Sequence, residues 1–542
     1  MNNEPRTDSV QDLSTDSVEV APQSRTATNV SKKPFLSRIT RKGERKKSRT
    51  LSFAMSSHFQ PEKPVGNPPG ILQQIRKIVF GSWLNVLLLL IPVSWILHFV
   101  KPGDDMPIFI TSFLAIIPLA QLLSFATDEM SMRVGQTLAG LLNATLGNAV
   151  ELIVAIIAII KCELEIVQSS LVGSILSNLL LVLGMCFFAG GMRFQEQGFG
   201  ASASQINASL LTLSVVAVLL PAAFHFAVEP ESSSSADPLS DPQELADIEK
   251  LSHGVAIVLL FIYGSYLVFQ LWSHASLYTD NHDADFKSTP HDQDISAHAV
   301  VNKVKRRFRR SPGRDPGTGE ILATNGDSKE KNGSTVNGNA INGSVEHHSD
   351  ETYAPNAADA EGQPQRKEDE DEETETPSLS FPVCIGLLAV VTVLVAVTAE
   401  FLVDSIDKFT TDSGISKQWV GLILLPIVGN AAEHVTAVTV SVKDKLTLSI
   451  GVAVGSSIQI ALFVIPLMVI IAWGLGKPLL LLFDPFESVT LFLAVLTVNY
   501  VVQDGKSNWL EGMILMCLYI IIAISFWFYP GSTISEVLRT CS

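Results

Sequence analysis

Residues 147–151 read GNAVE, and residues 429–433 repeat the pattern as GNAAE, 282 positions further along the chain. Each copy lies inside an apolar run long enough to cross a bilayer. An ionised carboxylate loses its hydration in hydrocarbon, so Glu151 and Glu433 indicate functional groups that face a partner or water inside a membrane protein. Packing of small residues between helices would explain the glycines but not the two glutamates.

The same offset relates a second stretch, because Val172-Gly173-Ser174 corresponds to Val454-Gly455-Ser456. An ungapped correspondence across two consecutive apolar segments predicts an internal repeat. Repeats of this kind build the two halves of many secondary transporters around a site near the midplane of the membrane.

The composition is that of a polytopic membrane protein, with 47% hydrophobic and 17% charged residues and the apolar residues in blocks. A hydrocarbon layer of roughly 30 Å requires about twenty residues per helix. Eleven blocks meet this length: 79–100, 106–125, 140–160, 167–190, 207–226, 254–273, 379–403, 418–442, 448–472, 479–502 and 510–529.

The predicted fold is therefore all-α, with eleven transmembrane helices. Two five-helix repeats occupy residues 106–273 and 379–529, and one extra N-terminal helix lies at 79–100. Because each repeat has an odd number of spans, the two copies are inverted relative to each other, and their glutamates can meet near the midplane.

The remaining segments are polar. Residues 1–70 are interpreted as a disordered cytosolic tail, 274–378 as a disordered cytosolic linker that carries the acidic run EDEDEETE, and 530–542 as a short C-terminal tail. The acidic run either collects cations or is simply a solvated stretch of charge. The basic cluster KVKRRFRR at 303–310 favours a cytosolic N-terminus and a lumenal C-terminus. The net charge of −16 comes largely from these polar segments and argues against nucleic-acid binding.

Oxygen-bearing residues near the two glutamates predict a site for a hard divalent cation, since Ca²⁺ accepts about six to eight oxygen ligands. The asparagines precede the glutamates by three residues on the same helical face, and the glycines can open the helix to expose carbonyl groups. The predicted ligands are Glu151, Glu433, Asn148, Asn430, Gly147, Gly429, Ser174, Ser456 and Gln459. Interhelical hydrogen bonding is the alternative role for the serines. No cluster of Cys or Met accompanies the site, which disfavours copper, whereas Mn²⁺ accepts the same ligands.

Proton coupling is expected at Glu151 and Glu433, with His434 as a further candidate because imidazole titrates near physiological pH. A hydrogen-bonded neighbour is the alternative role for His434. Two pairs of carboxylates at the ends of helices are candidates for acidic vestibules or for ordinary solvated groups: Asp128 with Glu129, and Glu400 with Asp404.

Four motifs resemble the two signature pairs of the calcium/proton exchangers of the cation/calcium antiporter superfamily, most closely the vacuolar exchangers of fungi and plants. The motifs are GNAVELIVAI at 147–156, GSILSNLLLVLG at 173–184, GNAAEHVTAV at 429–438 and VGSSIQIALFVIP at 454–466. The resemblance implies a transporter rather than an enzyme, without a bound cofactor. It implies a protein of the vacuolar membrane that moves Ca²⁺ from the cytosol into an acidic store in exchange for protons.

The residues themselves predict the same mechanism, because two facing carboxylates can be neutralised by one Ca²⁺ or by two protons, and the two ions then compete. A sodium-coupled calcium exchanger, a Mn²⁺/H⁺ exchanger, a channel and a non-transporting scaffold remain alternatives. The expected partners are Ca²⁺, H⁺ and the lipid bilayer. The sequence leaves the stoichiometry and the oligomeric state open.

Overall fold

The computed structural model describes residues 66–101, 103–134, 136–227, 242–278, 288–290 and 377–531. Most of the predicted tail at 1–70, most of the predicted linker at 274–378 and most of the tail at 530–542 lie outside the described residues.

Helices dominate the first half of the chain. A short helix, α2 (Ile71–Phe80), precedes the apolar segments. The elements that follow are η1 (Trp83–Leu89), α3 (Leu90–Val100), α4 (Asp105–Ser131), α5 (Gln136–Leu146), α6 (Ala149–Ile160), α7 (Leu164–Leu176), η2 (Ser177–Val182), α8 (Leu183–Gly191), α9 (Ala201–Ala227), α10 (Pro242–Val268), η4 (Phe269–Ser273) and η5 (Ala275–Tyr278).

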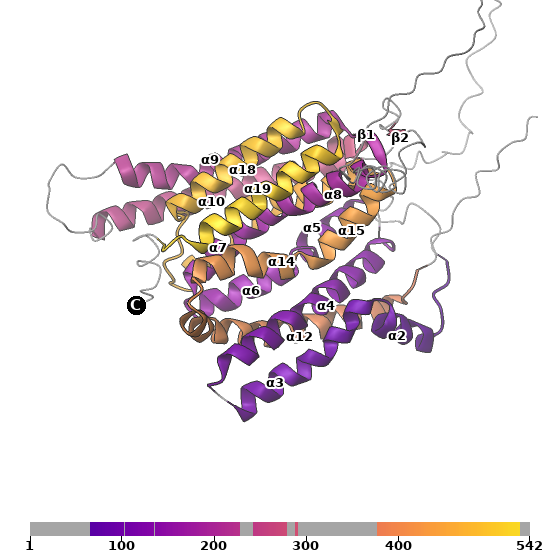
Figure 1. The fold of residues 1–542 in the computed structure, drawn as a ribbon, viewed down its shortest axis with the longest axis horizontal. Helices are drawn as coiled ribbons and strands as arrows, with labels where there is room; N and C mark the ends of the chain where they lie inside the picture. The colour runs from indigo at the N-terminus through magenta and orange to yellow at the C-terminus, as the bar shows by residue number, and fades with distance from the viewer. Residues whose placement is uncertain are drawn as a thin grey trace, which may run out of the picture. The chain divides into compact units, whose positions relative to one another are not determined.

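The second half repeats this pattern of long helices and broken helices. Its elements are α12 (Phe381–Ser413), α13 (Lys417–Trp419), η7 (Val420–Leu424), α14 (Leu425–Gly429), α15 (Ala431–Val442), α16 (Leu446–Gln459), η8 (Ile460–Val464), α17 (Ile465–Gly474), α18 (Pro485–Val501) and α19 (Trp509–Trp527). In Figure 1 the broken helices α5, α6, α14 and α15 lie between the group α3, α4 and α12 and the group α8, α9, α18 and α19.

Eight helices of the described chain are long and apolar enough to cross a membrane. The pair Lys417–Gly429 and Ala431–Val442, bent by 56°, adds a ninth if it counts as one span. Two predicted spans contain shorter apolar helices, Ala149–Ile160 and Pro485–Val501. The first begins after a break at Gly147 and Asn148. The second begins only at Pro485, because the Asp484 side chain caps the helix there. The count of eleven spans therefore stays a prediction.

A small antiparallel sheet departs from the all-α prediction. Its central strand is β1 (Phe194–Gly198), flanked by β2 (Thr289–Pro290) and β3 (Lys506–Ser507). Strands of two to five residues are too short to show the alternating hydrophobic pattern on which prediction depends. β2 lies within the predicted linker, and its two residues pair with β1.

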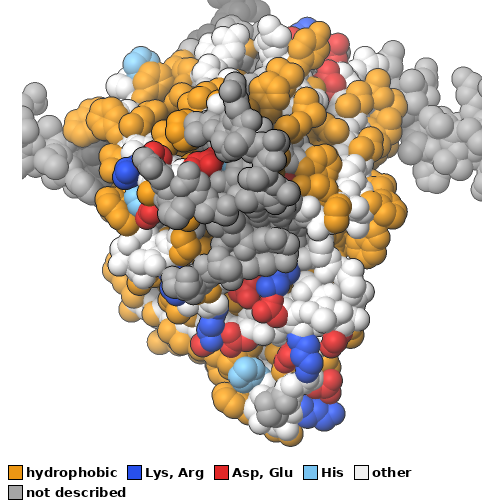
Figure 2. Space-filling view, turned by 90° about the vertical axis from the view of Figure 1, so that its left-hand side faces the viewer, with side chains coloured by type: hydrophobic (Ala, Val, Ile, Leu, Met, Phe, Trp, Pro, Cys, Tyr) orange, Lys and Arg blue, Asp and Glu red, His pale blue; other side chains and the backbone are white. Residues whose placement is uncertain are grey.

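Contacts between connecting segments distinguish two ends of the bundle. At one end, called the cavity end here, Arg193 Nη1 donates a hydrogen bond to the carbonyl oxygen of Val442 at 3.0 Å. At the other, called the closed end, Lys161 Nζ lies 2.9 Å from Asp404 Oδ1. Figure 2, which views the closed end, shows acidic and basic side chains gathered on it. Since α6 ends beside Lys161 and α15 ends at Val442, the two motif helices run in opposite directions.

Candidate ion-binding site

Both motif glutamates lie in the first turn of a helix that begins at a break. Asn148 is the N-cap residue of α6 and Asn430 is the N-cap residue of α15. Glu151 and Glu433 each follow three residues later, where the unpaired N–H groups and the dipole of the helix favour negative charge. The repeated motif thus produces the same local structure in both halves of the chain.

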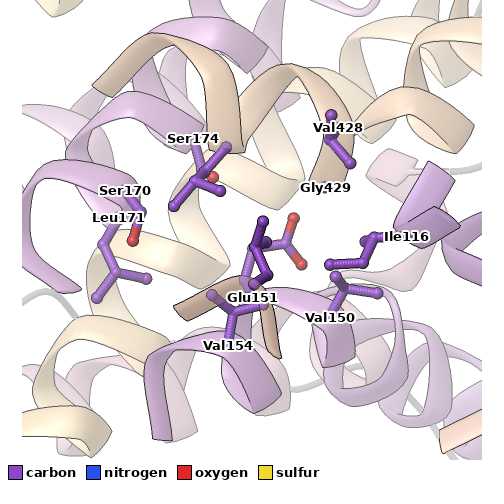
Figure 3. A pocket seen from close by; sticks show the side chains of 11 residues that line it. Ile116, Val150, Glu151, Val154, Ser170, Leu171, Ser174, Val428 and Gly429 are labelled. Carbon is purple, nitrogen blue, oxygen red and sulfur yellow. The ribbon is translucent and has the colours of Figure 1, made fainter. Parts of the chain in front are cut away.

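The two halves meet at Glu151. A Cβ atom added to Gly429 would lie 2.7 Å from Glu151 Oε1, so the carboxylate of the first half rests against the backbone of the second. Figure 3 shows Glu151 between Ser174 and Gly429. The close approach explains why the second motif has glycine at position 429, since any side chain there would occupy the place of the carboxylate.

A hydrogen-bond network of amides and hydroxyls also joins the halves. Asn148 Nδ2 donates to Gln459 Oε1 at 2.6 Å, and Ser456 Oγ donates to Asn148 Oδ1 at 2.9 Å. Asn178 Nδ2 donates to Ser456 Oγ at 3.1 Å. The structure therefore brings together three predicted ligands. It adds Asn178, which the predicted ligand set lacked, although this residue is a lone amide inside the apolar run GSILSN.

Glu433 lies beside this network, near Ser456 and Asn178, and close enough to Glu151 for the two charges to interact. Within the described chain, several buried polar atoms here have no hydrogen-bond partner: Glu433 Oε2, Asn178 Oδ1, and both Asn430 Oδ1 and Nδ2. Buried polar groups are normally paired. Three unpaired oxygens around two glutamates suit a hard cation, which takes oxygen ligands from carboxylates and amides.

The two glutamates differ in access. Glu433 lines a cavity of about 400 Å³ together with Gly147, Ser456 and Gln459. Its wall includes further polar residues near the cavity end, namely Asp128, Asn143, Asn207, Tyr278, Thr436 and Thr447. Glu151 instead lines a separate cavity of about 30 Å³, whose walls are mostly apolar and include Ile116, Val154, Leu171, Leu425 and Val428 (Figure 3). Ser174 lies in the same small cavity. The site thus borders a large cavity on the Glu433 side and only a small, mostly apolar one on the Glu151 side.

Ion pairs hold the closed end together. Lys161 Nζ lies 2.9 Å from Asp404 Oδ1 and 3.3 Å from Glu400 Oε1, which joins the end of α6 to α12. The hydrogen bond to Asp404 raises the pKa of Lys161 above its ordinary value. Glu400 and Asp404, predicted as vestibule carboxylates, therefore serve as partners of a lysine in this structure.

A second lysine ties α13 to the same end. Lys417 Nζ lies 2.9 Å from Glu163 Oε2 and also contacts Asp407. Burial raises the pKa of Glu163, although the hydrogen bond from Lys417 opposes this rise. These contacts link α7, α12 and α13 across the closed end.

The remaining predicted site residues either line the large cavity or connect helices of the bundle. Asp128 is exposed and lines the large cavity. Glu129 is 3% exposed, and its carboxylate accepts hydrogen bonds from the backbone N–H groups of Ser378 and Leu379 at 2.9–3.0 Å, so it anchors the start of α12. His434 Nε2 lies 3.4 Å from Ser177 Oγ. No group of three or more His, Cys, Asp or Glu side chains suited to a metal ion occurs among the residues that the structure describes.

Comparisons with known proteins identify the family. Residues 105–272 and 383–528 match the family described as sodium/calcium exchanger protein. The chain is 51% identical to a vacuolar calcium ion transporter of Cryptococcus neoformans, over 89% of this chain and 79% of that protein. It is 37% identical to a Ca²⁺/H⁺ antiporter of Aphanothece halophytica, over 82% of this chain and 96% of that protein. The solved structure of YfkE superposes with a TM-score of 0.55 at 26% identity and covers 82% of this chain and all of YfkE. The chain belongs to the sodium/calcium exchanger protein family.

Proposed function

We propose that this protein is a secondary antiporter that moves Ca²⁺ from the cytosol into an acidic store, the vacuole, in exchange for protons. The observation that carries the proposal is the approach of a glutamate from each half of the chain at paired helix breaks, beside hydrogen bonds among Asn148, Asn178 and Ser456 that join the two halves. The names of the relatives from Cryptococcus neoformans and Aphanothece halophytica support Ca²⁺ and protons as the exchanged ions.

Competition between Ca²⁺ and protons follows from the charge of the site. Two carboxylates in a low-dielectric setting are costly unless their charge is compensated. One Ca²⁺ compensates both charges, and two protons remove them. Each loaded form is close to neutral, so the site can change its exposure from one side of the membrane to the other when it holds either load. The unloaded, doubly charged form resists this change, and transport becomes obligatory exchange.

The described conformation is proposed to face the cytosol. The large cavity then connects Glu433 with the cytosol, and Asp128 attracts cations at its wall. The closed end, with its lysine–carboxylate pairs, then faces the lumen. We further propose that residues 106–273 and 379–529 form inverted repeats, with the extra helix at 79–100 outside them. The opposite directions of α6 and α15 support this arrangement.

Proteoliposomes with an acidic interior and Ca²⁺ outside test the proposal. Two protons per Ca²⁺ across about two pH units supply roughly 5.5 kcal/mol, enough for a Ca²⁺ ratio of about 10⁴. We expect uptake to stop when the pH gradient is collapsed and to be absent when a sodium gradient replaces it. Uptake that runs on sodium alone would instead favour the sodium-coupled alternative, and competition by Mn²⁺ in the same assay measures selectivity.

The variants Glu151→Gln and Glu433→Gln test whether Ca²⁺ uptake depends on the two glutamates of the site. Gln retains the shape of the side chain and removes its charge, so each variant is expected to abolish Ca²⁺ uptake while it is still inserted and folded. Glu196→Gln is the matched control, because Glu196 lies in β1 and only approaches Lys506 at 3.8 Å with its side chain half exposed. Substantial uptake by either site variant would refute the two-glutamate mechanism.

A further inference from the structure

A buried carboxyl group lies outside the ion-binding site, at the closed end. Glu487 is in the first turn of α18 and only 1% exposed. The Asp484 side chain begins this helix as its N-cap and accepts a hydrogen bond from the Phe486 N–H at 2.8 Å. Asp484 is also bonded to Tyr529 Oη at 3.1 Å and to Gln418 Nε2 at 3.2 Å. Asp484 is therefore a buried carboxylate in which both oxygens accept hydrogen bonds, whereas Glu487 has one oxygen, Oε1, without a partner in the described chain.

Among the residues that the structure describes, no cation compensates the charge of Glu487. The charged groups that face it are both acidic, Glu165 of α7 and Asp484. Of the other elements packed there, α13 contributes Gln418, which is an amide. The lysine that begins α13, Lys417, is bonded to Glu163 and Asp407. An ionised, buried carboxylate beside two others would carry a large electrostatic cost.

The hydrogen bonds of Ser169 are compatible with a proton on Glu487. Glu487 is hydrogen-bonded to the Ser169 side chain. A serine hydroxyl has a single proton to donate, and Ser169 Oγ donates it to the backbone oxygen of Glu165 at 2.7 Å. A protonated Glu487 carboxyl can donate to Ser169 Oγ while that hydroxyl stays with the Glu165 oxygen, so the arrangement accommodates the protonated form.

Two buried acceptor oxygens near Asp484 lack hydrogen-bond partners in the described part of the chain. Within the described residues, Glu487 Oε1 and Gln418 Oε1 have no hydrogen-bond partner, and both side chains are at most 2% exposed. Ser169, which contacts Glu487, is followed on α7 by Ser170, which lines the small cavity around Glu151. Neighbouring positions of one helix thus connect the buried carboxyl with the closed side of the ion site.

We propose that Glu487 is a proton-binding site of the closed end, which takes protons from the lumen and supplies them to Glu151. In each cycle one proton leaves the Glu487 carboxyl for the Glu151 carboxylate that Ca²⁺ has vacated, and a proton from lumenal water restores Glu487. This inference rests on the proposed Ca²⁺/H⁺ exchange. It adds a group that determines how transport depends on lumenal pH without being a ligand of Ca²⁺.

Two measurements on purified, reconstituted protein test the proposal. Infrared difference spectra between acidic and alkaline samples should contain the carbonyl band of a protonated carboxylic acid, and Glu487→Gln should remove part of it. In proteoliposomes, the dependence of initial Ca²⁺ uptake on internal pH should become several-fold weaker in Glu487→Gln, with an unchanged Ca²⁺ concentration for half-maximal uptake. Glu487→Asp, which restores an ionisable group, should recover much of the pH dependence.

Glu129→Gln is the matched control, because Glu129 is similarly buried but lies at the cavity end and accepts hydrogen bonds from two backbone N–H groups, those of Ser378 and Leu379. It should lower thermal stability without changing the dependence on internal pH. An unaltered pH profile and an unaltered infrared band in Glu487→Gln would overturn the proposal, as would a uniform loss of uptake at every pH that Glu487→Asp does not recover. Failure of the wild-type protein to couple Ca²⁺ uptake to the pH gradient would instead refute the proposed function, while the infrared result would stand on its own.

Discussion

Gly455 provides a direct test of the exchange between two conformations. It corresponds to Gly173 in the repeat, yet the two glycines have different surroundings. A Cβ atom added to Gly173 would lie 2.2 Å from the backbone oxygen of Leu422, whereas nothing lies within 4 Å of one added to Gly455. If inverted repeats exchange their environments during transport, Gly455 takes up the tight contact in the opposite conformation.

The size of the expected effect follows from the 2.2 Å between the Cβ atom added to Gly173 and the backbone oxygen of Leu422. Ordinary contact begins at 3.4 Å, so a methyl group at the tight position is 1.2 Å too close (3.4 − 2.2 Å) to a backbone atom that cannot rotate away. Overpacking of this kind costs about 1–3 kcal/mol. The helix-propensity gain of Gly→Ala applies to both conformations and cancels. Gly455→Ala should therefore reduce the population of the opposite conformation by about 5- to 150-fold.

Ca²⁺ flux and cysteine labelling together measure the change in the population of the opposite conformation. Leu448 lines the large cavity and is 39% exposed, so Leu448→Cys reports how open the cavity end is to a membrane-impermeant maleimide. Gly455→Ala should slow Ca²⁺ uptake and keep this cysteine accessible. Gly173→Ala, which crowds the described conformation, should make it less accessible.

Gly264→Ala is the control for the substitution itself. Gly264 lies in α10, and nothing lies within 4 Å of an added Cβ atom. Gly264→Ala should leave both Ca²⁺ flux and cysteine labelling unchanged. Wild-type flux in Gly455→Ala, or a shift of labelling in the same direction by Gly455→Ala and Gly173→Ala, would refute the reasoning.

Two further predictions concern the closed end and the linker. Burial raises the pKa of Glu163 in the closed arrangement, so Glu163 binds a proton more tightly there than in an opened arrangement. The protonated side chain therefore stabilises the closed arrangement at low pH. This stabilisation is lost as the pH rises through the raised pKa of Glu163. The side chain in Glu163→Gln is neutral at every pH. Maleimide labelling of Ile415→Cys should therefore vary less with pH in Glu163→Gln than in the protein that keeps Glu163. Equal variation with pH in both proteins would contradict this account. Deletion of residues 311–360, which lie outside the described chain, should leave membrane insertion and basal uptake intact because loop length changes closure entropy only slowly; an inserted protein without flux would show that the segment takes part in transport.

Several features of this protein could be predicted from local patterns. The apolar blocks require only that enough consecutive residues avoid charge, and each of the predicted blocks contains helical structure. The repeated GNA motifs mark both helix breaks, since glycine and asparagine end one helix and cap the next. The network of Asn148, Ser456 and Gln459 also joins residues that the repeat had singled out.

Other features depend on contacts between distant parts of the chain. The two motifs are nearly identical, so no local pattern could tell that Glu433 lines the large cavity while Glu151 lines a small, mostly apolar one. Glu129 and Asp128 are neighbours in sequence, yet one anchors α12 and the other faces the cavity.

The sequence by itself determined that the chain folds into apolar helices around two matched carboxylates, because hydrophobic length and buried charge act locally along the chain. Only the tertiary structure decided which carboxylate lines the large cavity, which acidic groups are paired with lysine and which, like Glu487, have acidic neighbours. The physical reason is that access and charge compensation depend on side chains brought together from helices hundreds of residues apart, where packing rather than sequence spacing sets the distances.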